Sequence, residues 1–227
     1  MKDRLKSIHS RIKTAALVSG RNPADVRLIA VSKTVPVEKL EKAIESGVAV
    51  FGENYIQESR EKFNALYAHP ISWHFIGHLQ SNKAKYAVKM FDLIHSVDSL
   101  KLSRELDKQA GKIDKVQPVL VQVNISEESS KSGVLLDDTV HLVTEMSRLT
   151  HIAIKGLMTM PPYFNAPEKA RPFFRNLRHL RDHLLSLEIP DVCMTELSMG
   201  MTGDFEVAIQ EGATLVRIGT AIFGERV

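Results

Sequence analysis

A single lysine stands at the end of the first apolar, β-branched segment of the chain. Residues 26–32 alternate so that Ile29, Val31 and Lys33 lie on one face of an extended strand. An ammonium group that emerges from an apolar wall loses hydration, which lowers the pKa of a lysine, as imine formation with an aldehyde requires. The alternative is a lysine that extends into solvent, which is the commoner arrangement for such a residue considered alone.

Two segments near the end of the chain each combine an apolar strand with a turn of small residues, LSMGMTGDFEVAI and VRIGTAIFG. In parallel α/β barrels the loops after the seventh and eighth strands often bind phosphate, because exposed backbone N–H groups there point at the anion. Each segment alone is typical of an ordinary tight turn, but together they predict a phosphate ligand. The residues expected to contribute hydroxyl groups or close backbone approach are Ser198, Thr202, Gly200 and Gly219.

Arg217 lies inside the last apolar strand, where a charged side chain needs a partner. In a site that also holds an imine-forming lysine and a phosphate, an arginine can lie beside the ring nitrogen of pyridoxal phosphate. The alternative partner is a carboxylate such as Glu196, in a purely structural ion pair.

These groups meet only if the elements between them bring the strand ends together. Eight apolar segments alternate with seven segments of helical periodicity, which predicts a parallel sheet buried on both faces. Eight strands close a (β/α)₈ barrel of the TIM type. The expected strands cover residues 26–32, 48–52, 73–77, 93–97, 119–124, 152–158, 195–199 and 215–219. The expected helices cover residues 37–46, 56–66, 83–90, 100–109, 139–149, 168–187 and 205–211.

An amphipathic helix is expected over residues 1–20, packed on the barrel where an eighth helix would otherwise lie. The alternative architecture is a doubly wound open sheet, but no G-x-G-x-x-G motif follows the first strand. We therefore predict one α/β domain over residues 1–227, a TIM-type (β/α)₈ barrel with an extra N-terminal helix. A later stripe of arginines is typical of the solvent face of a core-facing helix, with weak contact to a phosphate polymer as the alternative. Its members are Arg171, Arg175, Arg178 and Arg181.

Composition and charge argue against several kinds of partner. The chain has 30 Lys and Arg against 27 Asp and Glu, and its net charge of +3 is too small to predict binding to nucleic acid or to an anionic membrane. The single cysteine, Cys193, excludes an internal disulfide and a cysteine-pair metal site, and we predict no metal. No apolar run reaches the length of a membrane span, and the N-terminus lacks the apolar core of a signal peptide. We expect a cytoplasmic monomer.

Several long motifs resemble one known family, the pyridoxal phosphate homeostasis proteins, which are related to the barrel half of alanine racemase. The matching segments span nearly the whole chain after the first helix. They are AVSKTV, FGENYIQE, WHFIGHLQSNK, SVDS, VNISEESSKSG, GLMTMPP, ELSMGMTGDFEVAI and GATLVRIGTAIFGER.

This resemblance implies a set of roles for individual residues. Lys33 would hold pyridoxal phosphate as a Schiff base, Arg217 would lie near the pyridine nitrogen, and Asn54 would stand beside the cofactor. Lys131 resembles a second lysine near the site entrance, with a solvated loop lysine as the simpler alternative. The expected phosphate contacts are Ser198, Gly200, Thr202, Gly219 and Thr220, and the expected wall residues are His74, Ile76 and Met199.

Two function classes follow from such a site. In the first, the protein holds pyridoxal phosphate and supplies or buffers it for apo-enzymes, without marked amino-acid turnover, and no residue is catalytic. In the second, it is an amino-acid racemase or another pyridoxal phosphate enzyme. The carrier is favoured because the chain ends soon after the eighth strand, where a racemase would need a further domain. None of the four tyrosines offers an obvious second base, and an arginine partner weakens the ring as an electron sink.

Overall fold

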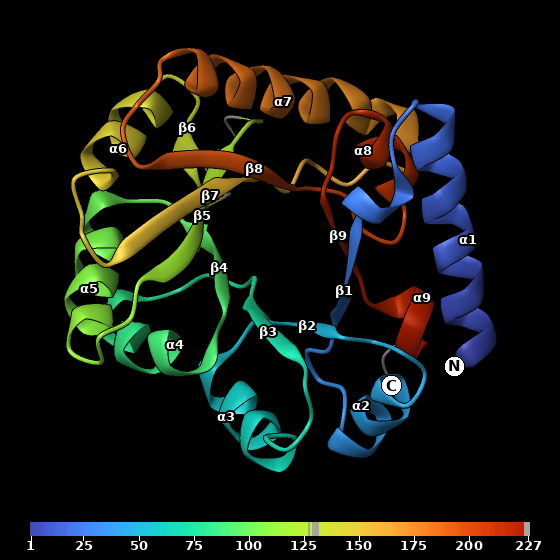
Figure 1. Ribbon diagram of the computed structural model, residues 1–227. Coiled ribbons are helices and arrows are strands. Elements are labelled where there is room, and N and C mark those ends of the chain that lie inside the picture. Colours follow the sequence, from blue (N-terminus) through green and yellow to red (C-terminus); the bar gives the residue numbers. More distant parts are fainter. Residues whose placement is uncertain (127, 129–131, 225–227) are drawn as a thin grey trace.

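Eight parallel strands form a closed barrel in the computed structural model, which describes residues 1–126, 128 and 132–224. The order around the barrel is β4-β3-β2-β1-β9-β8-β7-β5, and pairing of β4 with β5 closes the ring (Figure 1). The prediction of a TIM-type barrel is confirmed. The strands are β1 (Arg27–Val31), β2 (Val50–Glu53), β3 (Ser72–Phe75), β4 (Leu93–Val97), β5 (Gln117–Asn124), β7 (Ile152–Met158), β8 (Val192–Ser198) and β9 (Leu215–Ile218).

Helices surround this ring, as expected when both faces of the strands are apolar (Figure 1). Pro36 precedes the first turn of α2. Gly47 and Gly212, which follow the ends of α2 and α8, have φ values of 95° and 106°, which favour glycine. The helices are α1 (Lys2–Val18), α2 (Val37–Ile44), α3 (Ile56–Ala65), α4 (Ala84–Met90), α5 (Leu100–Gly111), α6 (Thr139–Met146), α7 (Arg171–Ser186), α8 (Phe205–Gln210) and α9 (Thr220–Phe223).

Two short elements were not expected from the sequence. The two-residue strand β6 (Val134–Leu135) pairs with β5 outside the ring, and the four-residue helix α9 follows β9. Neither is long enough to show a hydrophobic period. The N-terminal helix α1 packs against α8 and α9, on the β1 and β9 side of the barrel (Figure 1). Among the described residues, no helix combines the length and apolar character needed to cross a membrane.

The barrel interior is divided between an apolar and a polar layer. The apolar side chains form a small buried cluster of their own, while the larger core lies between the strands and the surrounding helices. Buried polar side chains come from β3, β4, β8 and β9, and they include His74, His95, Ser198 and Arg217. The members of the apolar cluster are Ile29, Leu93, Leu120, Met158 and Leu215.

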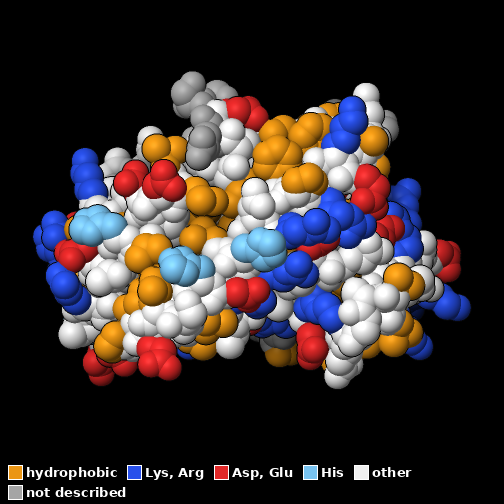
Figure 2. All heavy atoms as spheres, turned by 90° about the horizontal axis from the view of Figure 1, so that it is seen from above, with side chains coloured by type: hydrophobic (Ala, Val, Ile, Leu, Met, Phe, Trp, Pro, Cys, Tyr) orange, Lys and Arg blue, Asp and Glu red, His pale blue; other side chains and the backbone are white. Residues whose placement is uncertain are grey.

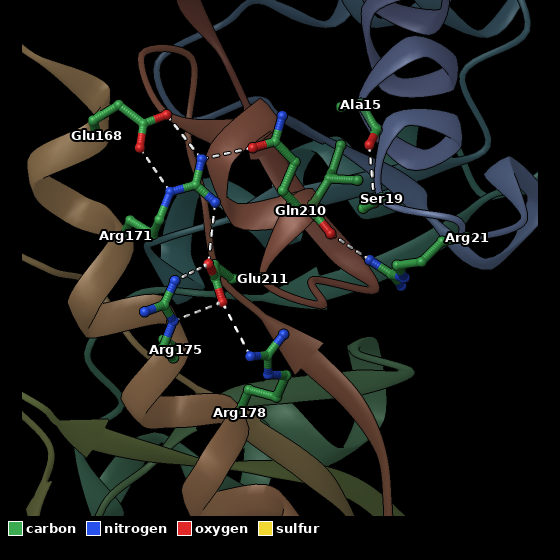
Figure 3. Close-up of polar contacts among 10 residues, drawn as sticks. Ala15, Ser19, Arg21, Glu168, Arg171, Arg175, Arg178, Gln210 and Glu211 are labelled. Atoms are coloured by element: carbon green, nitrogen blue, oxygen red, sulfur yellow. Dashed lines mark hydrogen bonds and ion pairs between the residues drawn. The ribbon is translucent and has the colours of Figure 1, made fainter.

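Helix α7 covers one side of the barrel and holds the end of α8. Its apolar face is buried as predicted. Its basic side chains lie on the surface that is seen from above in Figure 2. The arginine face is more than a solvated surface, because three of its guanidinium groups surround the Glu211 carboxylate (Figure 3). The shortest N–O distances to Glu211 are 3.0 Å from Arg171, 3.1 Å from Arg175 and 3.3 Å from Arg178.

A fourth arginine binds the same end of α8 from the other side. Arg21 Nη1 donates to the carbonyl oxygens of Ile209 and Ala213, at 2.7 and 2.8 Å. These bonds satisfy carbonyl groups at the C-terminal end of a short helix, where a cation is also favoured. The opposite end of α8 begins directly after the glycine-rich turn that follows β8, so α7 and Arg21 together fix the position of that turn.

Candidate functional site

Lys33 lies in a turn two residues beyond the end of β1, at the carboxyl end of the barrel strands. Its neighbour Thr34 has a φ of 62°, a left-handed conformation that is rare for a β-branched residue. The Thr34 N–H donates to Glu58 Oε1 of α3 at 2.5 Å. The turn is therefore held by α3, and the Lys33 side chain is half-buried as it leaves the first strand.

The turns after β8 and β9 lie against each other. Thr220 Oγ1 is 3.4 Å from Thr202 Oγ1, so the hydroxyl groups of the two turns meet. Gly200 has a φ of 90°, and a Cβ atom there would lie 2.5 Å from the Cβ of Ala208. Its carbonyl oxygen accepts a hydrogen bond of 3.0 Å from the Arg217 N–H, which extends the contact between the two strands beyond their regular pairing.

The second of these turns also lies beside the first strand. Ala30 pairs with Ile218, which places Gly219 next to the end of β1. A Cβ atom at Gly219 would lie 3.3 Å from the Val31 carbonyl oxygen, so only a residue without a side chain fits here without displacing a neighbour. The Lys33 turn and the two threonine turns are thus adjacent at one end of the barrel.

Arg217 extends from β9 into the barrel interior, where it is 3% exposed. Its Nη1 donates to Ser198 Oγ at 2.5 Å, and its Nη2 donates to the Thr159 carbonyl oxygen at 2.9 Å. Glu196, the carboxylate considered as its partner, pairs instead with Arg27. Within the described part of the chain, the guanidinium is therefore held by neutral oxygens rather than by an ion pair.

A chain of hydrogen bonds continues from Arg217 across the interior. Arginine can only donate, so Ser198 Oγ accepts from it, and the same oxygen is hydrogen-bonded to His95 Nδ1 at 2.9 Å. His95 Nε2 is in turn hydrogen-bonded to His74 Nδ1 at 3.0 Å. Four side chains are thus linked in one buried chain.

Burial determines the charges along this chain. Desolvation lowers the pKa of His74 to about 4, and the charge of Arg27 acts in the same direction. Desolvation, together with the charges of His74 and Arg217, lowers the pKa of His95 well below its usual value. Burial also lowers the pKa of Arg217 to about 10, so its guanidinium stays protonated at neutral pH. At neutral pH this hydrogen-bonded chain therefore contains the charged guanidinium of Arg217 and the neutral imidazoles of His74 and His95.

Acidification is expected to destabilise the protein through His74. The unfolded chain gains a proton on this residue near its ordinary pKa of 6.5, whereas the folded chain gains it only near 4. The stability that neutral His74 confers is therefore fully present above pH 6.5 and is lost as the pH falls toward 4. This group alone should account for a loss of about 3 kcal/mol. Urea unfolding at a series of pH values measures it.

The His74→Gln variant is the matched test, because the glutamine amide can either donate a hydrogen bond to His95 or accept one from it. We expect a smaller slope of unfolding free energy against pH in this variant, with His95 supplying the remainder. The control is His179→Gln, on the exposed face of α7. Equal slopes in wild type and His74→Gln would contradict the assignment.

Asn54 and the following turns line a cavity at the same end of the barrel. The cavity has a volume of about 400 Å³, and its lining includes Ile76, Gly77, His78, Met160 and Met201. Asn54 Oδ1 is buried and has no hydrogen-bond partner among the described residues. A buried oxygen of this kind needs a donor, which a bound molecule can supply.

The structure brings together most of the residues expected from the sequence. Lys33, Thr202, Gly219 and Thr220 lie at adjacent turns, and Asn54 and Ile76 line the cavity. Ser198 is completely buried, and its hydroxyl group is hydrogen-bonded to Arg217 and His95. Its contact with a phosphate stays a prediction. The wall residues His74 and Met199 are buried, and Lys131 lies outside the described residues.

Comparison with known proteins places the chain in a family. Residues 4–227 match the family model of the alanine racemase N-terminal domain. A pyridoxal phosphate homeostasis protein of Aquifex aeolicus is 45% identical over 224 residues, which cover 99% of this chain and 97% of the relative. One from Vibrio alginolyticus is 41% identical over 98% of this chain and 96% of the relative.

Solved structures agree with the sequence relatives. PipY of Synechococcus elongatus, solved with pyridoxal phosphate bound, has a TM-score of 0.86 and 35% identity, covering 98% of this chain and 99% of its own. Alanine racemase of Clostridium difficile has a TM-score of 0.76 at 16% identity, and this chain covers 57% of it, so that likeness shows the fold alone. The chain belongs to the family of pyridoxal phosphate homeostasis proteins, which share the barrel of the alanine racemase N-terminal domain.

Proposed function

We propose that the protein binds pyridoxal 5′-phosphate at the carboxyl end of its barrel and takes part in pyridoxal phosphate homeostasis, holding and releasing the cofactor without marked amino-acid turnover. The observation that carries this proposal is the convergence of the Lys33 turn with two hydroxyl-bearing turns above a buried arginine. The names of the relatives, and the PipY structure with pyridoxal phosphate, support the same ligand. The composition of the chain favours the cytoplasm as its compartment.

The residues fit such a ligand in charge, polarity and space. The Lys33 amine is the group that can form a covalent bond with an aldehyde, which pyridoxal phosphate supplies when bound. The Thr202 and Thr220 hydroxyls can donate to its phosphate, and the unpartnered Asn54 oxygen can accept a hydrogen bond. Gly200 and Gly219 keep the adjoining backbone free of side chains.

Arg217 favours a carrier over a catalyst. A buried guanidinium that is protonated at neutral pH disfavours protonation of a nearby pyridine nitrogen, and an unprotonated ring withdraws electrons less strongly. The alternative, an amino-acid racemase, is suggested by the match to the alanine racemase N-terminal domain, but the alanine racemase structure is only 16% identical and shows the fold alone. We propose apo-enzymes that require the cofactor as its recipients.

Removing both threonine hydroxyls tests the phosphate contact. A variant with Thr202→Ala and Thr220→Ala is expected to bind pyridoxal phosphate at least about tenfold more weakly, because hydrogen bonds to charged groups contribute about 1.5–3 kcal/mol each. Binding of pyridoxal, which lacks the phosphate, should hardly change. Absorption titration of both ligands measures the ratio, with the exposed Thr195→Ala as the control. Equal weakening for the two ligands would place the phosphate elsewhere.

The same titration separates two roles for Ser198. If Ser198 contacts the phosphate directly, Ser198→Ala should weaken the binding of pyridoxal phosphate more than the binding of pyridoxal. A role through Arg217, which the structure favours, predicts similar weakening of both ligands, because the arginine lies in the interior and not at the threonine turns.

A further inference from the structure

A buried lysine lies beneath the Lys33 turn. Lys62 of α3 is 4% exposed, and no other lysine in the described part of the chain is buried. Its ammonium donates to three acceptors: Glu53 Oε1 at 2.8 Å, Glu58 Oε1 at 2.5 Å and the Ser32 carbonyl oxygen at 2.6 Å. A lysine ammonium has three hydrogens, so every donor is used. Glu53 is completely buried, and Ser32 Oγ donates to the same Glu53 oxygen.

The acceptors of Lys62 are connected to the backbone on both sides of Lys33. The Ser32 carbonyl belongs to the peptide bond immediately before Lys33. Glu58 Oε1 accepts from Lys62 and also from the N–H of Thr34, the residue immediately after Lys33. One ammonium therefore fixes the main chain before the lysine directly and the main chain after it through one carboxylate.

The turn needs such support because its conformation is unfavourable in isolation. Thr34 is a β-branched residue with a φ of 62°, and its Oγ1 donates to the Lys33 carbonyl oxygen at 2.6 Å. Backbone in a sparsely populated region persists only where surrounding contacts determine it, and such strain is concentrated at functional sites. The turn also has a backbone hydrogen bond of its own, from the Val35 N–H to the Ser32 carbonyl oxygen at 3.0 Å. The contacts that reach it from outside come from α3 and from the end of β2.

We propose that Lys62, acting through Glu53 and Glu58, is a positioning residue that holds the backbone of Lys33 so that its amine faces the aldehyde of the bound cofactor. This inference rests on the proposed function, because it assumes that Lys33 is the attachment point. Lys62 itself does not contact the cofactor, since its donors are all bonded within the protein. Its loss should therefore slow attachment and leave the phosphate turns intact.

Three variants test the role, and two of them avoid leaving a buried charge without its partner. Lys62→Met removes the ammonium but leaves the buried Glu53 carboxylate without its partner, which is destabilising. The double variant Glu53→Gln with Lys62→Met removes both charges, and Glu58→Gln changes only a carboxylate whose side chain is 25% exposed. The matched control is Lys115→Met, a half-buried lysine that donates to the carbonyl oxygens of Val88 and Phe91, away from the Lys33 turn.

Two ligands separate attachment from binding. The rate of covalent capture of pyridoxal 5′-phosphate is followed by borohydride trapping and intact mass, and the affinity for pyridoxine 5′-phosphate, which has no aldehyde, is measured by titration. We expect capture to slow by about 10- to 100-fold in Lys62→Met and in the double variant, because a misplacement of about 1 Å has effects of this size. A smaller slowing is expected in Glu58→Gln. The affinity for pyridoxine 5′-phosphate and the capture rate of Lys115→Met should stay at the wild-type values.

The outcomes distinguish this inference from the proposed function. If wild type captures no pyridoxal phosphate, the proposed function fails before any variant is compared. If wild type captures it and the double variant or Glu58→Gln captures it equally fast, the positioning role is overturned. Parallel losses of capture and of pyridoxine 5′-phosphate affinity would also overturn it, because they would show a general loss of the site.

Discussion

Replacing Lys33 by alanine is expected to abolish covalent attachment of pyridoxal phosphate to the protein. The lysine leaves the end of β1 beside the turns that carry Thr202 and Thr220, and we propose its amine as the group that reacts with the aldehyde. Without that amine, the phosphate and ring contacts can retain the cofactor only reversibly. Wild type should therefore show the visible absorption of lysine-bound pyridoxal phosphate, and Lys33→Ala should lose it.

Reduction with borohydride makes the attachment permanent, so that the number of cofactor molecules bound to each protein can be measured by mass. Intact mass should show one added cofactor on wild type, and peptide mapping should place it on Lys33. The control is Lys39→Ala, an exposed lysine of α2 that follows the same turn. A Lys33→Ala protein that still gains the cofactor mass, at another lysine and to the same extent, would refute the assignment.

The barrel could be predicted from the sequence because its strands are buried on both faces. Continuous apolar segments mark such strands clearly, and β4 and β7 begin and end where the sequence indicates. Prediction was less accurate where a strand is partly exposed. β8 begins at Val192 rather than at residue 195, because Cys193 and Thr195 are exposed and the apolar pattern starts only further along the strand.

The contacts that complete the site could not be read from sequence spacing. His95 lies in an apolar strand, and only closure of the barrel brings it to Ser198, 103 residues away. Lys62 lies in a helix rich in charged residues, where a lysine is normally exposed, and nothing local indicates that it reaches the Ser32 carbonyl. The phosphate contact predicted for Ser198 from its hydroxyl beside a small-residue turn stays a prediction, and the sequence does not indicate that this hydroxyl also bonds to Arg217 and His95.

The partners of Arg217 in the barrel interior are neutral, which distinguishes it from an arginine held in an ion pair. A carboxylate partner would offset its charge, whereas Ser198 and the Thr159 carbonyl hold it with neutral oxygens among the described residues. The neutral imidazoles beyond Ser198 supply no countercharge either, because burial keeps their pKa values low. The charge of Asp204 acts on Arg217 and raises its pKa, but the larger effect is the lowering by burial. We propose that this positive charge acts on a ring bound at the mouth of the barrel, which bears on turnover.

Incubation of the cofactor-loaded protein with L- and D-amino acids in deuterated water is expected to give no catalytic exchange of the α-hydrogen. A ring that accepts electrons strongly assists removal of that hydrogen, and we propose that a protonated Arg217 near the ring nitrogen disfavours the ring protonation that makes it do so. The cofactor should pass instead to an apo-enzyme, at a rate that falls when release from Lys33 is prevented by borohydride reduction. Exchange over many turnovers per site, abolished in Lys33→Ala, would establish an enzyme and overturn the carrier. Arg217→Glu replaces the guanidinium that we propose to lie near the ring by a carboxyl group, so any gain of exchange in that variant, with wild type inactive, would identify the arginine as the group that suppresses turnover.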